Sequence, residues 1–158
     1  MRAVVTLAVL WVAAGSAAAQ DVKPFAKGSW AALRQSHQGK PLIVHFWGIT
    51  CPPCLGELPR WSELVAERRD VRVIFVAADP VPVDRGRVER TLADAGLGES
   101  ENWMFQGEFF DPLRYEVSPD WGGELPLTLL IDKAGTITTI AGVTDLSVVR
   151  EWLAAHAR

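Results

Sequence analysis

Hydrophobic residues gather in short runs that are separated by proline, glycine and charged residues. Residues 42–47 and 71–77 are apolar at almost every position, and the second run is rich in β-branched side chains. Continuous runs of this length are typical of strands that are buried on both faces of a sheet. The pattern therefore predicts two central strands.

Between these two runs, apolar residues recur every three or four positions, as they do on the buried face of a helix. They are Leu55, Leu58, Trp61, Leu64 and Val65. This spacing predicts a helix over residues 53–69, which would join the two strands as a parallel pair. Further helices are predicted over residues 29–38, with Ser29 as the cap, and over residues 83–97, 109–115 and 146–157.

The second half of the chain contains two short strand patterns around a turn. In LPLTLLIDKAGTITTIAG, residues 125–142, Gly135 ends the turn, where its tolerance of positive φ suits a β-hairpin. Another strand is predicted over residues 103–106, and a loop over residues 118–124. A hairpin beside a parallel pair predicts an α/β fold, with a central mixed β-sheet flanked by helices on both faces.

Size and charge limit the function classes. The chain has 158 residues, of which 49% are hydrophobic and 22% charged, and its formal net charge is -3. This length suits one domain, and the charge lacks the basic excess of a nucleic-acid-binding protein. We expect a single domain with no nucleic-acid partner.

Residues 1–19 have the layout of a secretory signal peptide. Arg2 precedes an apolar run over residues 3–14, and small residues end at Ala19. Cleavage after Ala19 would leave residues 20–158 as an exported, periplasmic domain. The alternative is an uncleaved membrane anchor, although the run is shorter than the roughly 20 residues of a spanning helix.

Both cysteines follow the first predicted strand, with Pro52 and Pro53 between them. Because proline is favoured at the first positions of a helix, Cys51 is expected at a helix N-terminus. Unpaired N–H groups and the helix dipole there lower the pKa of a thiol. Cys51 is therefore predicted to be the nucleophile, and Cys54, one turn further on, to resolve the mixed disulfide.

Other uses of the cysteine pair are open. A purely structural disulfide would contribute only about 2 kcal/mol in so short a loop. Zinc needs four ligands, and besides the cysteines the chain offers only the scattered His37, His45 and His156. Copper(I) needs only two soft thiolates, so transient copper binding is the main alternative. No metal site is predicted.

The motifs, in their order along the chain, resemble the thioredoxin superfamily, and within it the exported TlpA/ResA-type thiol-disulfide oxidoreductases. The resemblance runs from about Lys40 to the C-terminus and rests on PLIVHFWGITCPPC, LGELPRWSEL, VRVIFVAAD and ELPLTLLIDKAG. It implies a thioredoxin-like fold over residues 20–158. It also implies that a redox-active Cys51–Cys54 disulfide, without another cofactor, reduces or exchanges disulfides in client proteins.

The resemblance implies roles for residues around the cysteines. Pro126 would be a cis-proline that faces them, and Leu125 would offer its backbone to an extended substrate segment, in a contact surface that includes Pro52 and Pro53. Glu57 matches an acidic residue that tunes the cysteines, and its charge would raise the pKa of the Cys54 thiol. The alternative for Glu57 is a solvated position on a helix face.

Three positions depart from the family pattern. Thr50 stands where Trp usually precedes the first cysteine, which predicts a different docking surface or redox potential. His45 stands where thioredoxins have a buried Asp, and could accept the proton of Cys54 as a general base; the alternative is a hydrogen-bonded core residue. Trp121, in the loop DWGGELP, is expected to cover the active-site groove; its alternative is a core aromatic.

By the same resemblance, the expected clients are exported proteins with thiols or disulfides, such as apocytochrome c or copper-site assembly factors. A membrane protein is expected to supply electrons, and the chain is expected to be a monomer. Two other functions stay open, copper(I) handling and disulfide donation. The reduction potential, which this sequence pattern does not fix, separates a reductase from a donor.

Overall fold

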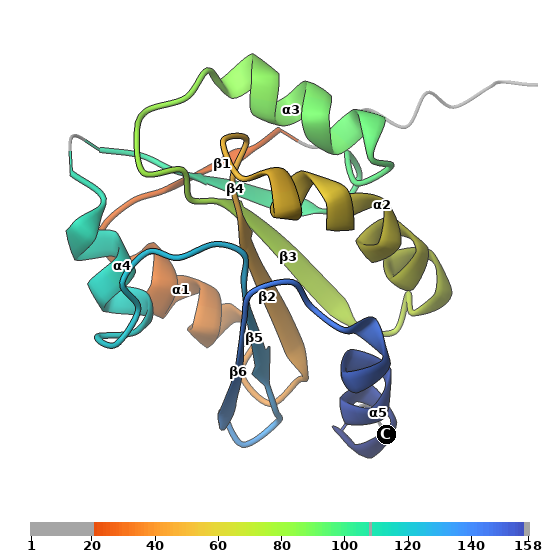
Figure 1. Ribbon diagram of the computed structural model, residues 1–158. Helices are drawn as coiled ribbons and strands as arrows, with labels where there is room; N and C mark the ends of the chain where they lie inside the picture. Colours follow the sequence, from red (N-terminus) through yellow and green to blue (C-terminus); the bar gives the residue numbers. More distant parts are fainter. Residues whose placement is uncertain (1–20, 108, 157–158) are drawn as a thin grey trace, which may run out of the picture.

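The structure is a computed structural model that describes residues 21–107 and 109–156. Its strands are β1 (Lys23–Phe25), β2 (Leu42–Trp47), β3 (Arg72–Ala77), β4 (Glu101–Phe105), β5 (Leu127–Ile131) and β6 (Ile137–Ala141). Its helices are α1 (Ser29–Ser36), α2 (Pro52–Glu67), α3 (Arg85–Asp94), α4 (Asp111–Val117) and α5 (Leu146–His156). The strands form one sheet in the order β1-β4-β3-β2-β5-β6, with helices on both faces (Figure 1).

β2 lies inside the sheet and contacts strands of both directions. It pairs with β3 in parallel and with β5 in antiparallel orientation. β5 and β6 form the predicted hairpin, in which Asp132 accepts the N–H groups of Ala134 and Thr136 at the turn. The predicted mixed sheet flanked by helices on both faces is therefore confirmed.

β2 also divides its side chains between two hydrophobic layers, because successive residues of a strand point to opposite faces. Ile43 and Trp47 pack beneath α2, α3 and α5, and His45 points to the same side, where it contacts Trp61. The intervening residues, including Phe46, pack beneath α1 and α4. The strand is buried along its whole length, as its continuous apolar run predicts.

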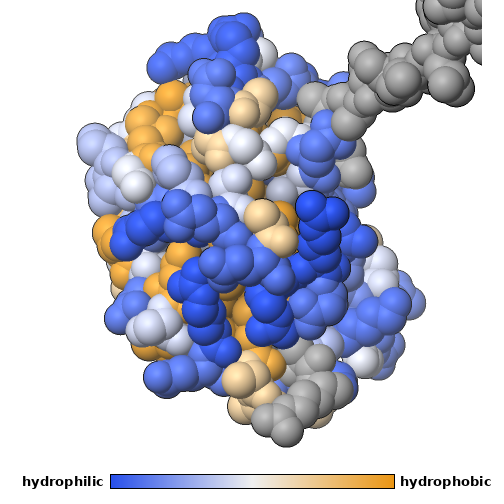
Figure 2. Space-filling model, turned by 90° about the vertical axis from the view of Figure 1, so that its right-hand side faces the viewer, coloured by the Kyte–Doolittle hydropathy of each residue, from blue (hydrophilic) through white to orange (hydrophobic). Residues whose placement is uncertain are grey.

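The helix that follows β2 is amphipathic. Leu58, Trp61 and Leu64 of α2 are buried against the sheet. On the outer side, Arg150 of α5 donates a 2.9 Å hydrogen bond to Glu67 of α2. Figure 2 shows the surface on this side of the molecule as largely hydrophilic, with separate hydrophobic patches. The buried face of α2 thus fixes the position of its N-terminus over the end of β2.

The start of the domain differs from the sequence predictions in two ways. β1 escapes prediction because three residues are too few to show a pattern; it pairs in parallel with β4 at the edge of the sheet. Ser29 was expected to cap α1, but Gly28 occupies the cap position. Ser29 instead belongs to the first turn, and its Oγ accepts the N–H of Ala26 at 2.9 Å.

Element ends between residues 83 and 117 lie one to three residues from their predicted positions. Capping groups set these ends, and hydrophobic spacing does not reveal them. Asp84 caps α3 by accepting the N–H of Arg87, and Gly96 follows the end of that helix with a φ of 77°. At α4, Pro112 lies in the first turn, so the helix starts two residues later than predicted.

The predicted signal peptide over residues 1–19, like its alternative of a membrane anchor, lies outside the described residues. Within residues 21–107 and 109–156, no helix is both long enough and apolar enough to cross a membrane.

Candidate active site

Cys51 and Cys54 form a disulfide at the N-terminus of α2. Cys51 is the N-cap residue, and its Sγ accepts the backbone N–H of Cys54 at 3.3 Å. Pro52 and Pro53 form the start of the helix and are exposed. The predicted placement of Cys51 at a helix N-terminus is confirmed.

The two cysteines differ in exposure. Cys54 is fully buried and packs in the same hydrophobic layer as Leu58 and Trp61, whereas Cys51 is partly exposed. A sulfur from another protein can therefore approach Cys51 but not Cys54. The pair has one accessible sulfur and one protected sulfur.

A tight turn joins β2 to α2 and presents Cys51. The N–H of Cys51 donates to the carbonyl oxygen of Gly48 at 3.3 Å. The helix starts at Pro52 because proline has a fixed φ and no N–H, which suits the first position of a helix. Cys51 is thus held where the strand ends and the helix begins.

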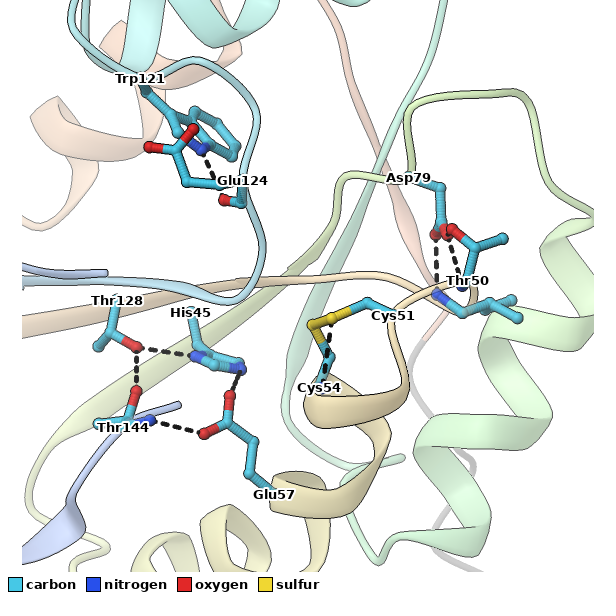
Figure 3. Close-up of a disulfide and its surroundings, with 11 residues drawn as sticks. His45, Thr50, Cys51, Cys54, Glu57, Asp79, Trp121, Glu124, Thr128 and Thr144 are labelled. Carbon is cyan, nitrogen blue, oxygen red and sulfur yellow. Dashed lines mark hydrogen bonds and ion pairs between the residues drawn. A yellow bond between two sulfur atoms is a disulfide. The ribbon is translucent and has the colours of Figure 1, made fainter. Parts of the chain in front are cut away.

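Four polar residues form a closed set of contacts beside the disulfide (Figure 3). His45 Nδ1 lies 2.9 Å from Thr128 Oγ1, which lies 2.8 Å from Thr144 Oγ1. Thr144 donates its N–H to Glu57 Oε2 at 2.8 Å, and Glu57 Oε1 lies 3.2 Å from His45 Nε2. All four residues are at most 1% exposed. They are named here the buried polar network.

One assignment of protons suits every member of the buried polar network. The O–H of Thr144 donates to Thr128, and the O–H of Thr128 donates to His45 Nδ1, so His45 carries its proton on Nε2, facing Glu57. The contact between Nε2 and Oε1 departs from hydrogen-bond geometry despite its length, and neither atom has another partner among the described residues. Oε1 of Glu57 therefore retains capacity to accept a proton.

The imidazole of His45 is neutral at neutral pH. Burial lowers its pKa below the usual 6.5, because the charged form would lose its hydration. The nearby Glu57 carboxylate raises the pKa but offsets only part of this effect. The contact of His45 with Glu57 is therefore not a fully charged ion pair.

The structure decides between the alternatives for Glu57. The residue is buried, so the alternative of a solvated glutamate on a helix face is wrong. It lies one turn beyond Cys54 on the buried face of α2, which makes the two side chains neighbours. His45 has the hydrogen bond expected of a core histidine, and its role as a general base for Cys54 stays a prediction.

The loop before β5 approaches the active-site turn. The Leu125–Pro126 peptide bond is cis, as predicted. Leu125 is partly buried and packs against the same hydrophobic layer as Cys51. A Cβ placed on Gly48 would lie only 3.1 Å from Leu125 Cδ1, so the two loops meet closely at that glycine.

From the sequence, Trp121 was expected to cover the active-site groove, but the structure places its side chain in the core. Its residue is 7% exposed, its ring centroid lies 4.8 Å from that of Phe46, and its indole N–H donates to the carbonyl oxygen of Glu124 at 2.9 Å. The apolar ring gains burial while its polar atom keeps a partner. Trp121 is therefore a core aromatic in the layer beneath α1 and α4.

Three buried residues at the site escaped sequence analysis. Asp79 follows β3 and contacts the turn before Cys51. Its position was a usable signal, because the carboxyl ends of parallel strands lie at one edge of a sheet. Thr128 and Thr144 carry no such signal, since Thr128 meets His45 only after β5 pairs with β2, and Thr144 meets Thr128 and Glu57 only in the folded chain.

Metal ligation has no further support in the described part of the chain, which contains no group of three or more His, Cys, Asp or Glu side chains placed to hold a metal ion. The two cysteine sulfurs are bonded to each other.

The chain is similar to curated thiol-disulfide oxidoreductases named ResA. It is 30% identical to ResA of Halalkalibacterium halodurans over 146 residues, which cover 85% of this chain and 73% of the relative. It is 29% identical to ResA of Bacillus thuringiensis subsp. konkukian over 126 residues, which cover 73% of this chain. The match spans 63% of that relative, less than two thirds of its length. No protein-family model matches the chain.

A similar solved structure is that of a secreted Mycobacterium tuberculosis disulfide oxidoreductase homologous to E. coli DsbE. It matches with a TM-score of 0.61 and 21% identity, over 77% of this chain and 85% of that chain. The likeness confirms the thioredoxin-like fold that the sequence predicts.

His45 should make the stability of the protein depend on pH. Because its pKa is lower in the folded chain than the unfolded value near 6.5, its stabilising effect is complete above pH 6.5 and is lost as the pH falls toward the folded pKa. The free energy of unfolding should fall in this range by at most about 1.4 kcal/mol per pH unit. Urea unfolding at successive pH values measures the slope, which should be smaller in His45→Gln. Equal slopes in the two proteins would contradict the assignment.

Proposed function

This chain belongs to the ResA family of thiol-disulfide oxidoreductases, and we propose that it exchanges disulfides with client proteins through Cys51 and Cys54. The observation that carries the proposal is the contrast between the partly exposed Cys51 and the buried Cys54 at one helix N-terminus. The first cysteine is accessible to a client, and the second is placed to release it. A disulfide with a structural role alone does not require this contrast.

The reductive reaction starts from the dithiol. The Cys51 thiolate attacks one sulfur of a client disulfide, the client S–S bond breaks, and the other client sulfur leaves as a thiolate. Cys54 then loses its proton and attacks Cys51 Sγ. The Cys51–Cys54 disulfide forms, the second client sulfur leaves as a thiolate, and two electrons have passed from the protein to the client.

The proton of the buried Cys54 needs an acceptor within the protein. Glu57 is one turn away on the same buried face of α2, and its Oε1 retains acceptor capacity. His45 holds that carboxylate in place with Nε2 and, being neutral, has one ring nitrogen without a proton, Nδ1, which accepts the O–H of Thr128. We assign Glu57 and His45 together as the proton-accepting pair.

The contact with the client involves the surface around Cys51. Pro52 and Pro53 are exposed beside the nucleophile, and Leu125 lies across the turn, before the cis-proline Pro126. An extended client segment that runs past Leu125 would place its disulfide at Cys51. The partly exposed backbone before β5 supplies hydrogen-bonding groups for such a segment.

The proposed direction is reduction in an exported compartment. The secretory layout of residues 1–19 supports export, as does the likeness to a protein described as secreted. A monomer of this kind needs a membrane protein that supplies electrons to regenerate the dithiol. Apocytochrome c and copper-site assembly factors are the proposed clients, and the two cysteine thiols carry the electrons without another cofactor.

The equilibrium of the cysteine pair with glutathione tests the direction. A reductase should have a reduction potential near that of thioredoxin, about -270 mV. The fraction of disulfide is measured by alkylation and mass determination across glutathione ratios. A potential near that of a strong disulfide donor, about -120 mV, would overturn the proposed direction but not the exchange reaction.

Cys54→Ser should trap clients as mixed disulfides with Cys51, because the resolving sulfur is absent. The trapped species are measured by non-reducing electrophoresis of periplasmic extracts from cells that express the variant. Cys51→Ser is the matched control and should trap none, since its remaining sulfur is buried. If the two variants give the same adducts, Cys51 is not the accessible nucleophile.

His45→Ala should slow the resolving step by about 100-fold, because Glu57 loses the partner that positions it. The pKa of the Cys54 thiol should rise, while alkylation of Cys51 stays close to that of the parent. Stopped-flow release from a preformed mixed disulfide measures the rate. Thr128→Val, which removes the hydroxyl shared by His45 Nδ1 and Thr144 but keeps the contact of His45 with Glu57, should have a smaller effect. A loss of stability with unchanged thiol kinetics would show that His45 is only a core residue.

A further inference from the structure

A second buried carboxylate lies on the opposite side of the disulfide from the buried polar network (Figure 3). Asp79, which follows β3, is 2% exposed. Its Oδ2 accepts the N–H of Ile49 at 3.0 Å, and its Oδ1 accepts both the N–H and the O–H of Thr50 at 2.8 Å. The carboxylate thus binds the two residues that immediately precede Cys51.

Close packing fixes the position of this carboxylate. A Cβ placed on Gly48 would lie 2.9 Å from Asp79 Oδ1, which is closer than real Cβ contacts allow. Glycine at this position therefore gives Asp79 room to reach the turn. The carbonyl oxygen of Trp47 accepts the N–H of Ala78 at 2.8 Å, which ties the segment before Asp79 to the end of β2.

We propose that Asp79 is a positioning residue that fixes the turn before Cys51 and, by its negative charge, disfavours the Cys51 thiolate, so that the protein is a stronger reductant. This inference rests on the proposed function, since it concerns the reactivity of the same sulfur. Thr50, which departs from the family pattern, takes part in this contact because its hydroxyl donates a hydrogen bond to the Asp79 carboxylate.

The hydrogen bonds at the turn support this role. A thiolate at a helix N-terminus is stabilised by nearby N–H groups. Here the N–H groups of Ile49 and Thr50 point to Asp79, and that of Cys51 points to Gly48. Among the described residues, the N–H group that donates a hydrogen bond to the Cys51 sulfur is that of Cys54.

The charges around the turn favour the same conclusion. The described helix α2 has no acidic residue in its first turn, and Asp79 is the acidic residue whose carboxylate bonds directly to the turn before Cys51. On the α3 side, Arg87 and Asp94 line a cavity together with Ile49, and they bring one charge of each sign. On the sheet side, Glu57 faces the neutral His45. Among the described residues, the hydrogen-bond partners of Asp79 are the neutral donors of Ile49 and Thr50, so its negative charge is left to act on Cys51.

Two substitutions with opposite expected effects test the inference. Asp79→Asn removes the charge, so the pKa of the Cys51 thiol should fall by about one unit and the glutathione equilibrium should shift about tenfold toward the dithiol. Thr50→Val keeps the charge but removes one donor from it, so the equilibrium should shift by about two- to threefold toward the disulfide. Thr50→Ser keeps the hydroxyl and should match the parent.

The measurements are the pH profile of Cys51 alkylation in the reduced protein, the glutathione equilibrium, and thermal unfolding as a check on folding. Shifts in the same direction for Asp79→Asn and Thr50→Val would show that both merely loosen the turn, and would overturn the inference. So would unchanged thiol properties with lowered thermal stability. If Asp79→Asn does not fold, the comparison of Thr50→Val with Thr50→Ser still decides, because only the valine should move the equilibrium.

Failure of the proposed function would be distinguishable from failure of this inference. If the parent protein neither reduces insulin disulfides nor yields mixed disulfides as Cys54→Ser, the proposed function fails. The glutathione equilibrium and the alkylation profile of Cys51 can still be measured in that case, and they decide on Asp79 independently.

Discussion

The contact between the buried imidazole of His45 and the buried carboxylate of Glu57 is the interaction on which the site depends. Neither group is tolerated in an apolar layer without partners, because burial removes the water that would stabilise it. The two threonines supply the remaining hydrogen bonds. Since the four residues come from β2, α2, β5 and the segment before α5, the contact exists only when these elements are assembled. Correct packing of the domain is therefore a condition for the polar surroundings of the disulfide.

The disulfide lies between two buried carboxylates, which contact different parts of the site (Figure 3). Glu57 is next to Cys54 in the buried layer and close to a neutral histidine. Asp79 holds the turn that leads to Cys51 and bonds only to backbone and hydroxyl donors. Oε1 of Glu57 has no hydrogen-bond partner among the described residues, whereas both carboxylate oxygens of Asp79 accept hydrogen bonds from the turn. The two cysteines thus have different polar neighbours, although they lie within one turn of helix.

The sequence predicts those parts of the fold and site that depend on local patterns. The apolar run of β2, the spacing of α2 and the prolines between the cysteines are all visible along the chain, and the structure agrees with them. Motif resemblance adds the cis bond at Pro126, which no local pattern reveals. Features that depend on tertiary contact are not predictable in this way. Examples are the burial of Glu57, the inward position of Trp121 and the partners of His45, since each is decided by a segment far away in sequence.

The alternation of side chains along β2 requires that the strand pairs with β3 and β5 in one exact register. A slip of one residue against β3 and β5 would exchange the two faces of the strand. The imidazole would then lie among the aromatic rings beneath α1 and α4, and Phe46 would take its place near Cys54. A misregistered molecule would leave the imidazole without its polar partners and would leave the Glu57 carboxylate without the contact to His45. The register of this one strand thus decides both the packing of the core and the assembly of the buried polar network.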